Sequence, residues 1–192
     1  MKNIYYRYIN FPFEFQKPRE FLDSPSIYQI GNEIEDCRNT ELMLDFLKNF
    51  NLSIGSAEGF YTLPKGKIPI HTDGISTSKI NITWGPENGL IQFYKPNKIY
   101  NSIGEIDILS GTRTNYDNTI KFAKEEESKL VCEVNTNRPT LLNVEEFHGT
   151  YNPDTKNGRW TLAYTIVDQN DTPVHWFSVI NILKDYLEES LM

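Results

Sequence analysis

IPIHTDGISTSKINITW (residues 68–84) consists of two β-type runs separated by a polar turn. His71 and Asp73 lie two residues apart at the end of the first run, and residues with this spacing on a strand project to the same face. An imidazole nitrogen and a carboxylate oxygen that converge on one point suit iron, zinc or manganese. Taken alone, the two residues are better explained as a polar strand end at which Asp73-Gly74 makes a turn. The rest of the chain has to decide between these interpretations.

Short β-type runs continue along the chain from Gly55 onward, and segments rich in Gly, Pro, Asn and Asp separate them. The runs are GFYTL (59–63), KIPIH (67–71), SKINITW (78–84), GLIQFY (89–94), GEIDIL (104–109), KLVCEV (129–134), PTLLNVEEF (139–147) and RWTLAYTIV (159–167). About eight short strands with such spacing favour a sandwich, a jelly roll or a small barrel. The sequence therefore predicts a mainly β fold.

Two helices are expected to flank this β core. EDCRNTELMLDFLKNF (35–50) places Leu42, Phe46, Leu47 and Phe50 on one stripe, after a possible cap at Asn39 or Thr40. HWFSVINILKDYLEESL (175–191) places Phe177, Ile180, Leu183 and Leu187 on one face. We expect the second helix to cover the outside of the sheet, with a dimer contact as the alternative.

The length of 192 residues predicts a single domain, 1–192. Its β core is expected at about 55–168, preceded by a strand and a helix within 1–54 and followed by the helix at about 174–190. The aromatic segment IYYRYINFPFEF, broken by Pro12, is expected to be an edge strand.

The composition of the sequence limits where the protein is expected to be located and which partners it is expected to bind. The net charge is −7 and no Lys/Arg cluster occurs, which argues against nucleic acid as a partner. No run of about 18 apolar residues predicts a membrane span. No secretory signal is evident at the start of the sequence, and we expect a cytoplasmic protein. Cys37 and Cys132 are expected to be reduced packing residues, although one disulfide between them stays an alternative.

The downstream residues shift the balance toward a metal site. His148 follows PTLLNVEEF, and Arg159 opens RWTLAYTIV after a turn-rich loop. We expect His148 at the end of one strand and Arg159 at the start of its antiparallel neighbour, so that both lie at the same end of the sheet. Arg159 and Thr161 are two apart and share a face.

His71, Asp73 and His148 together make the two-histidine, one-carboxylate set of non-haem Fe(II) oxygenases. Three protein ligands leave three positions for a bidentate 2-oxo acid and dioxygen. The distal carboxylate of 2-oxoglutarate needs a partner such as Arg159, with the hydroxyl of Thr161 beside it.

The sequence resembles the 2-oxoglutarate/Fe(II)-dependent dioxygenase superfamily over about residues 58–167. The pattern of that superfamily, His-x-Asp, a distal His and then Arg-x-Ser/Thr, matches HTD at 71–73, FHG around His148 and RWT at 159–161. LPKGKIPIHTD (63–73) and RPTLLNVEEFHGTYN (138–152) are similar to the prolyl and aspartyl/asparaginyl hydroxylase-like branches. Members of the latter branch often lack the carboxylate that Asp73 supplies here, so the branch stays open.

The resemblance implies a double-stranded β-helix, also called a jelly roll, with the metal at its open end. It implies Fe(II), 2-oxoglutarate and dioxygen as cofactor and co-substrates, and decarboxylation to succinate coupled to hydroxylation of a substrate C–H bond. A small-molecule or peptidyl substrate is expected, with a peptide side chain or an amino acid favoured. The alternation of SKINITW puts Lys79, Asn81 and Thr83 on one face. If that face lines the barrel, Asn81 and Thr83 contact the co-substrate; otherwise they lie in solvent.

Two other interpretations stay open. HGTYN (148–152) fits the second motif of a cupin-type metalloprotein that does not use 2-oxoglutarate, although no His-x-His precedes it. A metal-free jelly-roll binding or structural module would also explain the strands. Of the remaining residues, His175 is expected to cap the last helix or lie at the surface, and Arg113 to lie in a surface loop. Tyr94 and Trp160 could line a substrate cleft, but core packing is the stronger expectation.

Overall fold

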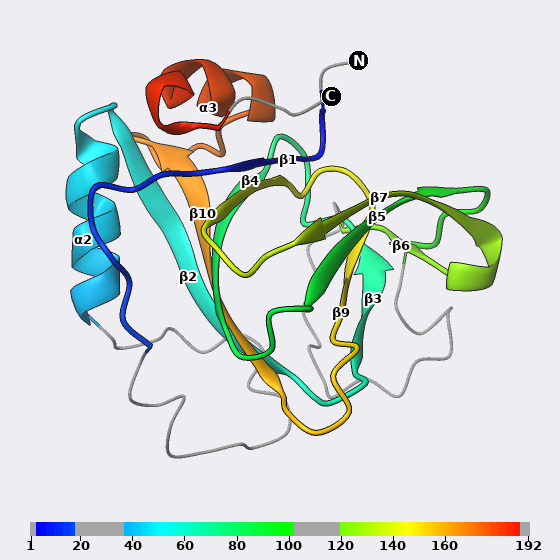
Figure 1. Cartoon of the computed structure of the whole chain (residues 1–192). Helices are drawn as coiled ribbons and strands as arrows, with labels where there is room; N and C mark the ends of the chain where they lie inside the picture. Colours follow the sequence, from blue (N-terminus) through cyan, green and yellow to red (C-terminus); the bar gives the residue numbers. More distant parts are fainter. Residues whose placement is uncertain (1–2, 18–36, 102–119, 189–192) are drawn as a thin grey trace.

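Two antiparallel five-stranded sheets lie face to face in this protein (Figure 1). The computed structural model describes residues 3–17, 37–101 and 120–188. The first sheet has the order β1 (Tyr6–Tyr8), β8 (Thr140–Asn143), β4 (Ser78–Trp84), β10 (Arg159–Asp168) and β2 (Leu52–Thr62). The second has the order β6 (Phe122–Ala123), β3 (Lys67–His71), β9 (His148–Tyr151), β5 (Leu90–Pro96) and β7 (Ser128–Asn135). Because β3, β4 and β5, and likewise β8, β9 and β10, alternate between the sheets, the predicted jelly roll is confirmed.

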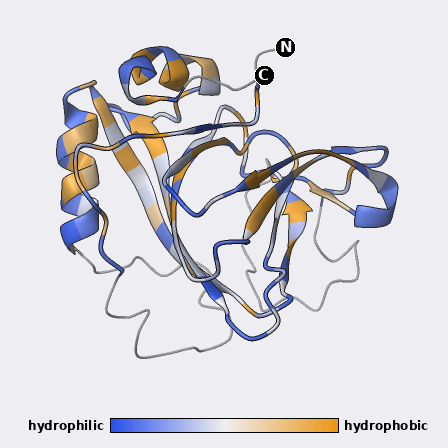
Figure 2. Cartoon of the chain, in the orientation of Figure 1, coloured by the Kyte–Doolittle hydropathy of each residue, from blue (hydrophilic) through white to orange (hydrophobic). Residues whose placement is uncertain are grey.

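The outer face of the first sheet carries the largest hydrophobic cluster. Ile80 and Ile82 of β4 point outward and pack with residues of two helices, α2 (Cys37–Lys48) and α3 (Trp176–Ile182). Hydrophobic and hydrophilic residues alternate along both helices, as one-sided burial requires (Figure 2). Since strand side chains alternate, Lys79, Asn81 and Thr83 point the other way, into the space between the sheets. The interpretation in which these three residues lie in solvent is therefore wrong.

The space between the sheets divides into an apolar and a polar part. On the side of β5, β7 and β8, the interior is filled by Ile91, Phe93, Val134 and Leu142, together with Val144. On the side of β2, β4 and β10, the inward-facing residues are mostly polar, because Thr161 and Thr165 of β10 lie opposite Thr83 and Lys79 of β4. A filled core on one side thus leaves a polar chamber on the other.

The run PTLLNVEEF does not form the single strand expected from its sequence. It forms β8 up to Asn143, then a turn, and His148 opens β9 in the opposite sheet instead of ending a strand. Val144 is buried in the interior cluster and Phe147 packs against an outer one, so these apolar residues serve the crossing between sheets. The expectation that His148 and Arg159 lie at the same end of one sheet is therefore wrong. Each opens a strand, and the two strands belong to different sheets.

The C-terminal helix is shorter than the predicted 174–190. After α3 the chain continues as a 3₁₀ turn, η3 (Lys184–Tyr186), and another 3₁₀ turn, η2 (Glu125–Glu127), precedes β7. Trp176, Val179 and Leu183 form the buried side, whereas Phe177 is exposed. The helix covers the outside of the first sheet as expected, and a dimer contact through it stays a prediction.

The remaining expectations have mixed outcomes. β1 is an edge strand that pairs with β8 alone, as predicted. Asn39 does not cap α2; it lies inside the helix and exchanges hydrogen bonds with the backbone of Gln16.

The thiol of Cys132 is free, whereas the side chain of Cys37 and the runs around 104–109 and Arg113 lie outside the described residues. Within the described ranges, no helix combines the length and apolarity needed to cross a membrane.

Candidate metal centre

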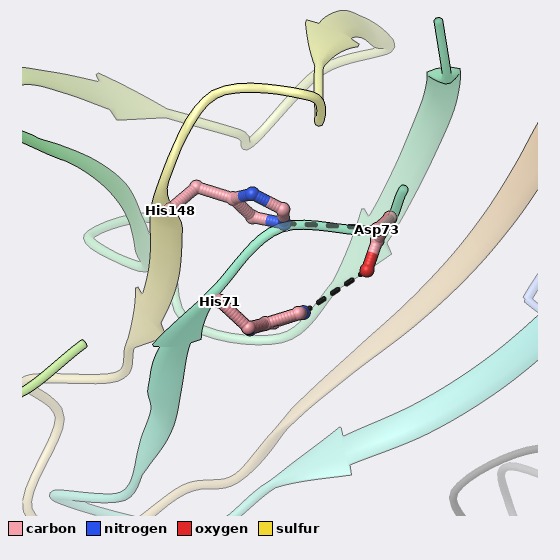
Figure 3. A group of neighbouring side chains, drawn as sticks. All are labelled: His71, Asp73 and His148. Atoms are coloured by element: carbon pink, nitrogen blue, oxygen red, sulfur yellow. Dashed lines mark ion pairs between the residues drawn. The ribbon is translucent and has the colours of Figure 1, made fainter. Parts of the chain in front are cut away.

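Three potential metal ligands meet where β3 ends and β9 begins (Figure 3). His71 is the last residue of β3 and His148 the first of β9, and the two are direct partners in the sheet. Their rings lie 4.6 Å apart between centroids. Asp73 lies just past the end of β3, where its backbone N–H donates to the carbonyl of Val144 at 2.9 Å. One potential ligand atom of each residue lies within 4.8 Å of the others, so the sequence prediction of a convergent set holds geometrically.

The carboxylate of Asp73 lies between the two imidazoles. Its Oδ1 is 3.1 Å from Nε2 of His71, and its Oδ2 is 3.8 Å from Nε2 of His148. The side chains of His71, Asp73 and His148 are 22%, 15% and 8% exposed. They are therefore shielded but not sealed, which a site that exchanges ligands requires.

Backbone carbonyls orient both histidines in the same way. Nδ1 of His71 lies 2.7 Å from the carbonyl oxygen of Pro69, and Nδ1 of His148 lies 2.9 Å from that of Glu146. A carbonyl accepts only, so each Nδ1 carries the hydrogen and each neutral ring presents the lone pair of Nε2. Histidines that bind a metal through one ring nitrogen usually donate a hydrogen bond of this kind from the other nitrogen. Both rings are thus held in the tautomer that binds a metal through Nε2.

The two histidines titrate differently. Burial lowers the pKa of His71, but the hydrogen bond and charge of Asp73 outweigh it, so the pKa is raised above 6.5. Burial and the nearby His71 lower the pKa of His148 to about 4. At neutral pH His148 is therefore ready to bind a metal, whereas a metal has to compete with a proton at His71 up to a higher pH than at an ordinary histidine.

Sequence reasoning missed a buried ion pair beside this triad. Nζ of Lys79 lies 2.9 Å from Oδ2 of Asp73 and 3.0 Å from Oε2 of Glu58 on β2. Burial lowers the pKa of Lys79, but the two carboxylates raise it to about 12. Burial raises the pKa of Asp73, yet Lys79 and His71 hold it well below its usual value. The inward face of SKINITW could have indicated Lys79, but its partner Glu58 lies on a strand that the motif does not include.

Arg159 is a second charged group in the polar chamber, and its side chain is almost fully buried. Its Nη1 donates to the carbonyl of Leu90 at 3.3 Å, and its Nη2 donates to the hydroxyl of Thr136. Burial lowers its pKa to about 10, so it stays charged at neutral pH. Among the described residues no carboxylate pairs with it. A buried cation without a counter-ion is costly, which indicates that an anion completes this site.

Several buried polar atoms around Arg159 also lack a hydrogen-bond partner among the described residues. They are Nε of Arg159 itself, Oγ1 of Thr62, Oδ1 of Asn81 and Oγ1 of Thr161. Thr62 is the neighbour of Arg159 across β2 and β10, and Asn81 and Thr161 share the inward face. The hydroxyl of Thr83 differs, because it donates to the carbonyl of Thr136. Buried polar atoms are normally satisfied, so this group indicates a polar ligand between the sheets.

The spacing between the triad and Arg159 follows from the register of the sheet. His148 pairs with Phe93 of β5, and Arg159 contacts the carbonyl of Leu90, three residues earlier on that strand. Three residues of a strand span roughly 10 Å. The triad and the guanidinium therefore lie at two depths of one chamber, a separation that an extended dicarboxylate can bridge.

The other residues considered from the sequence lie outside this chamber. Trp160 packs on the outer face against Tyr61, with ring centroids 4.8 Å apart, and Tyr94 is buried with Ile70 in an outer cluster. His175 caps α3, as expected, by accepting a hydrogen bond from the backbone of Phe177. These residues make core or surface contacts.

The asparagine of the cupin-like motif has a structural role. Nδ2 of the fully buried Asn152 donates to the carbonyls of Thr62, Leu63 and Asn157. It thereby ties the loop before Arg159 to the end of β2. None of these contacts involves the metal centre.

No protein-family model and no curated protein sequence matches this chain. Distant similarity exists to solved structures. HygX from Streptomyces hygroscopicus, solved with nickel and 2-oxoglutarate bound, is 13% identical with a TM-score of 0.42, over 79% of this chain and 74% of that one. AviO1 from Streptomyces viridochromogenes Tue57 is 15% identical with a TM-score of 0.45, over 87% of this chain and 76% of that one. An oxalate oxidase is 12% identical with a TM-score of 0.32, over 93% of this chain and 88% of that one.

Proposed function

We propose that this protein is an Fe(II)- and 2-oxoglutarate-dependent oxygenase. The observation that carries the proposal is the pairing of two sites in one chamber. A triad of His71, Asp73 and His148 lies at one depth, and the buried guanidinium of Arg159 lies about 10 Å deeper. Three protein donors leave metal positions for a 2-oxo acid and dioxygen. Arginine matches the distal carboxylate of 2-oxoglutarate with charge-assisted hydrogen bonds.

The charges of the chamber balance when both ligands are bound. With His71 neutral, as metal binding requires, Asp73 and Glu58 are opposed by Lys79 and Arg159, so the side chains sum to zero. Fe(II) adds two positive charges and 2-oxoglutarate two negative ones. Neither ligand alone leaves the buried chamber neutral, which favours a site for both over a site for a metal alone.

The net reaction would convert 2-oxoglutarate, dioxygen and a substrate C–H bond into succinate, carbon dioxide and a hydroxylated product. The bound iron would supply the dioxygen chemistry. The chain would orient the co-substrate through Arg159, Thr161 and Asn81, and would shield the reaction from water with the packed interior around Phe93. We further propose a peptide side chain or a free amino acid as the substrate, and the cytoplasm as the site of action. Both rest on the sequence resemblance and composition.

One titration tests the proposal. Fe(II) and then 2-oxoglutarate are added without oxygen, and the visible metal-to-ligand charge-transfer band of the chelate is followed. We expect the band in the natural protein and no band in His71→Ala or His148→Ala. A band that persists in both variants would contradict the assignment. Metal binding that 2-oxoglutarate leaves unchanged would favour the cupin-type alternative, and no metal binding the structural module.

The variant Arg159→Met tests separately whether Arg159 binds 2-oxoglutarate. Met is a long, uncharged side chain, so the variant removes the charge while filling most of the space. Because Arg159 lies deep in the chamber and does not contact the triad, 2-oxoglutarate should bind at least about tenfold more weakly while the affinity for iron is kept. An equal loss of both affinities would show that Arg159 only maintains the fold. Succinate release over a panel of amino acids and peptides would then address the substrate.

A further inference from the structure

The pair of Lys79 and Glu58 has no role in the proposed chemistry, yet it lies directly beside the triad. Lys79 projects from β4 into the chamber, Glu58 from β2, and Asp73 from the loop after β3. The ammonium of Lys79 contacts both carboxylates at 2.9 and 3.0 Å, and its side chain is only 13% exposed. Three separate segments therefore bring three charges together at this point.

The contacts of Asp73 divide its two oxygens between different partners. Oδ2 is 2.9 Å from Nζ of Lys79, and Oδ1 is 3.1 Å from Nε2 of His71. Because Lys79 holds one oxygen in a short charge-assisted contact, only the other is free to bind a metal beside the histidines. An unrestrained carboxylate could bind with both oxygens and occupy a further coordination position.

Glu58 restrains Lys79 from the opposite side. Its carboxylate contacts the same ammonium, so the lysine is held between two acceptors and is not free to swing toward the two histidines. Glu58 also offsets the positive charge, which would otherwise oppose the binding of a divalent cation nearby. The pair can thus orient Asp73 with little electrostatic cost to metal binding.

We propose that Lys79, held by Glu58, is a positioning residue that restricts Asp73 to one-oxygen ligation and so keeps all three remaining coordination positions open for 2-oxoglutarate and dioxygen. This inference rests on the proposed function for its consequence, namely co-substrate binding. The coordination number of the bound metal, which the inference concerns directly, does not depend on 2-oxoglutarate.

Lys79→Met is the primary test, because it keeps the length of the side chain and removes the charge and the donors. The variant should still bind Fe(II), since a neighbouring cation is lost and a second oxygen is released. It should bind 2-oxoglutarate about tenfold more weakly, because the released second oxygen of Asp73 competes for a metal position; tenfold is the lower end of the range in which outer partners of metal ligands alter metal affinity or activity. Arg159→Met should weaken 2-oxoglutarate without changing the metal-only complex.

The metal-only complex is read with Co(II), whose visible absorption weakens as the number of ligands rises. Lys79→Met should give a weaker Co(II) spectrum than the natural protein. Lys79→Arg, which keeps the charge and the donors, should restore most of the intensity, and Glu58→Gln should shift it in the direction of Lys79→Met by a smaller amount. Lys67→Met is the matched control, because Lys67 pairs with Glu125 at an exposed site away from the chamber and its loss should change neither spectrum nor affinity.

Two results would overturn the inference. One is a Co(II) spectrum that is unchanged in Lys79→Met in a protein whose circular dichroism shows that it is folded. The other is a parallel loss of metal and 2-oxoglutarate in both Lys79→Met and Lys79→Arg, which would make the lysine a structural residue. Failure of the proposed function looks different: the natural protein would bind Co(II) without binding 2-oxoglutarate, and the Lys79→Met difference in the Co(II) spectrum would persist.

Discussion

Gly89 lies directly against the guanidinium of Arg159. A Cβ at Gly89 would approach Cδ of Arg159 to 2.5 Å, Nη1 to 2.9 Å and Nε to 3.0 Å, distances that force one of the two groups to move. Gly89 is buried and immediately precedes β5, whose Leu90 carbonyl accepts the hydrogen bond from Nη1. The absence of a side chain at Gly89 therefore makes the space in which the arginine lies.

Gly89→Ala should displace Arg159 and weaken the binding of 2-oxoglutarate without affecting the metal. Overpacking of a filled interior costs about 1–3 kcal/mol, which corresponds to a loss of affinity of about 5- to 150-fold if it acts on the ligand alone. Calorimetric titration of 2-oxoglutarate into the iron-loaded protein measures the loss. Asn88→Ala changes the exposed neighbouring residue and should bind like the natural protein. Unchanged binding in Gly89→Ala would show that the arginine does not contact the ligand.

Thr161→Val should separate stability from ligand binding. The hydroxyl of Thr161 is buried without a partner among the described residues, so replacing it with a methyl group removes an unsatisfied polar atom. The metal-free protein should keep its free energy of unfolding or gain up to about 1 kcal/mol, whereas 2-oxoglutarate should bind more weakly. Urea unfolding and ligand titration measure the two effects.

Thr140→Val is the matched control for Thr161→Val. Thr140 is equally buried and faces the same interior, but its hydroxyl donates to the carbonyl of Arg138 at 2.8 Å. The substitution should lower the free energy of unfolding by about 1 kcal/mol and leave ligand binding unchanged. If both variants lost stability equally, the hydroxyl of Thr161 would have a partner in the metal-free protein.

The sequence predicted the class of fold because the pattern that specifies it is local. KIPIH and SKINITW form β3 and β4 with the predicted bounds, since period-two alternation and flanking turns suffice to define such strands. The spacing of His71 and Asp73 predicts that these two side chains converge, and the resemblance to the oxygenase pattern implies that His148 joins them. What the motif did not contain was their relation to Arg159, which depends on the sheet to which each strand belongs.

The parts that were mispredicted depend on long-range packing. PTLLNVEEF reads as one strand, because nothing local marks the point at which the chain crosses between the sheets after Asn143. The ion pair of Lys79 and Glu58, which sequence reasoning missed, joins residues that are 21 positions apart on different strands. The last helix ends early and turns Trp176, not Phe177, toward the sheet, because the outer hydrophobic cluster selects the side that fills it best. Periodicity alone could not select among these contacts.

Asn152→Ala should destabilise the loop that leads to Arg159. Three backbone carbonyls, those of Thr62, Leu63 and Asn157, would lose the amide donor that they share, at a buried position. We expect the free energy of unfolding to fall by about 1–3 kcal/mol. The affinity for 2-oxoglutarate should fall with it, because the start of β10 loosens, while metal binding at the other depth of the chamber should be kept. A variant that lost the metal first would indicate that Asn152 supports the triad instead.

The pH dependence of metal binding should reveal the difference between the pKa values of His71 and His148. The pKa of His71 is raised above 6.5 while that of His148 is lowered to about 4, so between about pH 4 and the raised pKa only His71 holds a proton for the metal to displace. Affinity for Co(II) should therefore rise about tenfold per pH unit below the raised pKa of His71 and level off above it, with one proton released per metal. A second proton should be released only near pH 4, as His148 protonates. Titrations in buffers of different ionisation enthalpy count the protons directly. Release of two protons per metal at pH 6 would mean that the histidines titrate alike and that Asp73 does not favour His71.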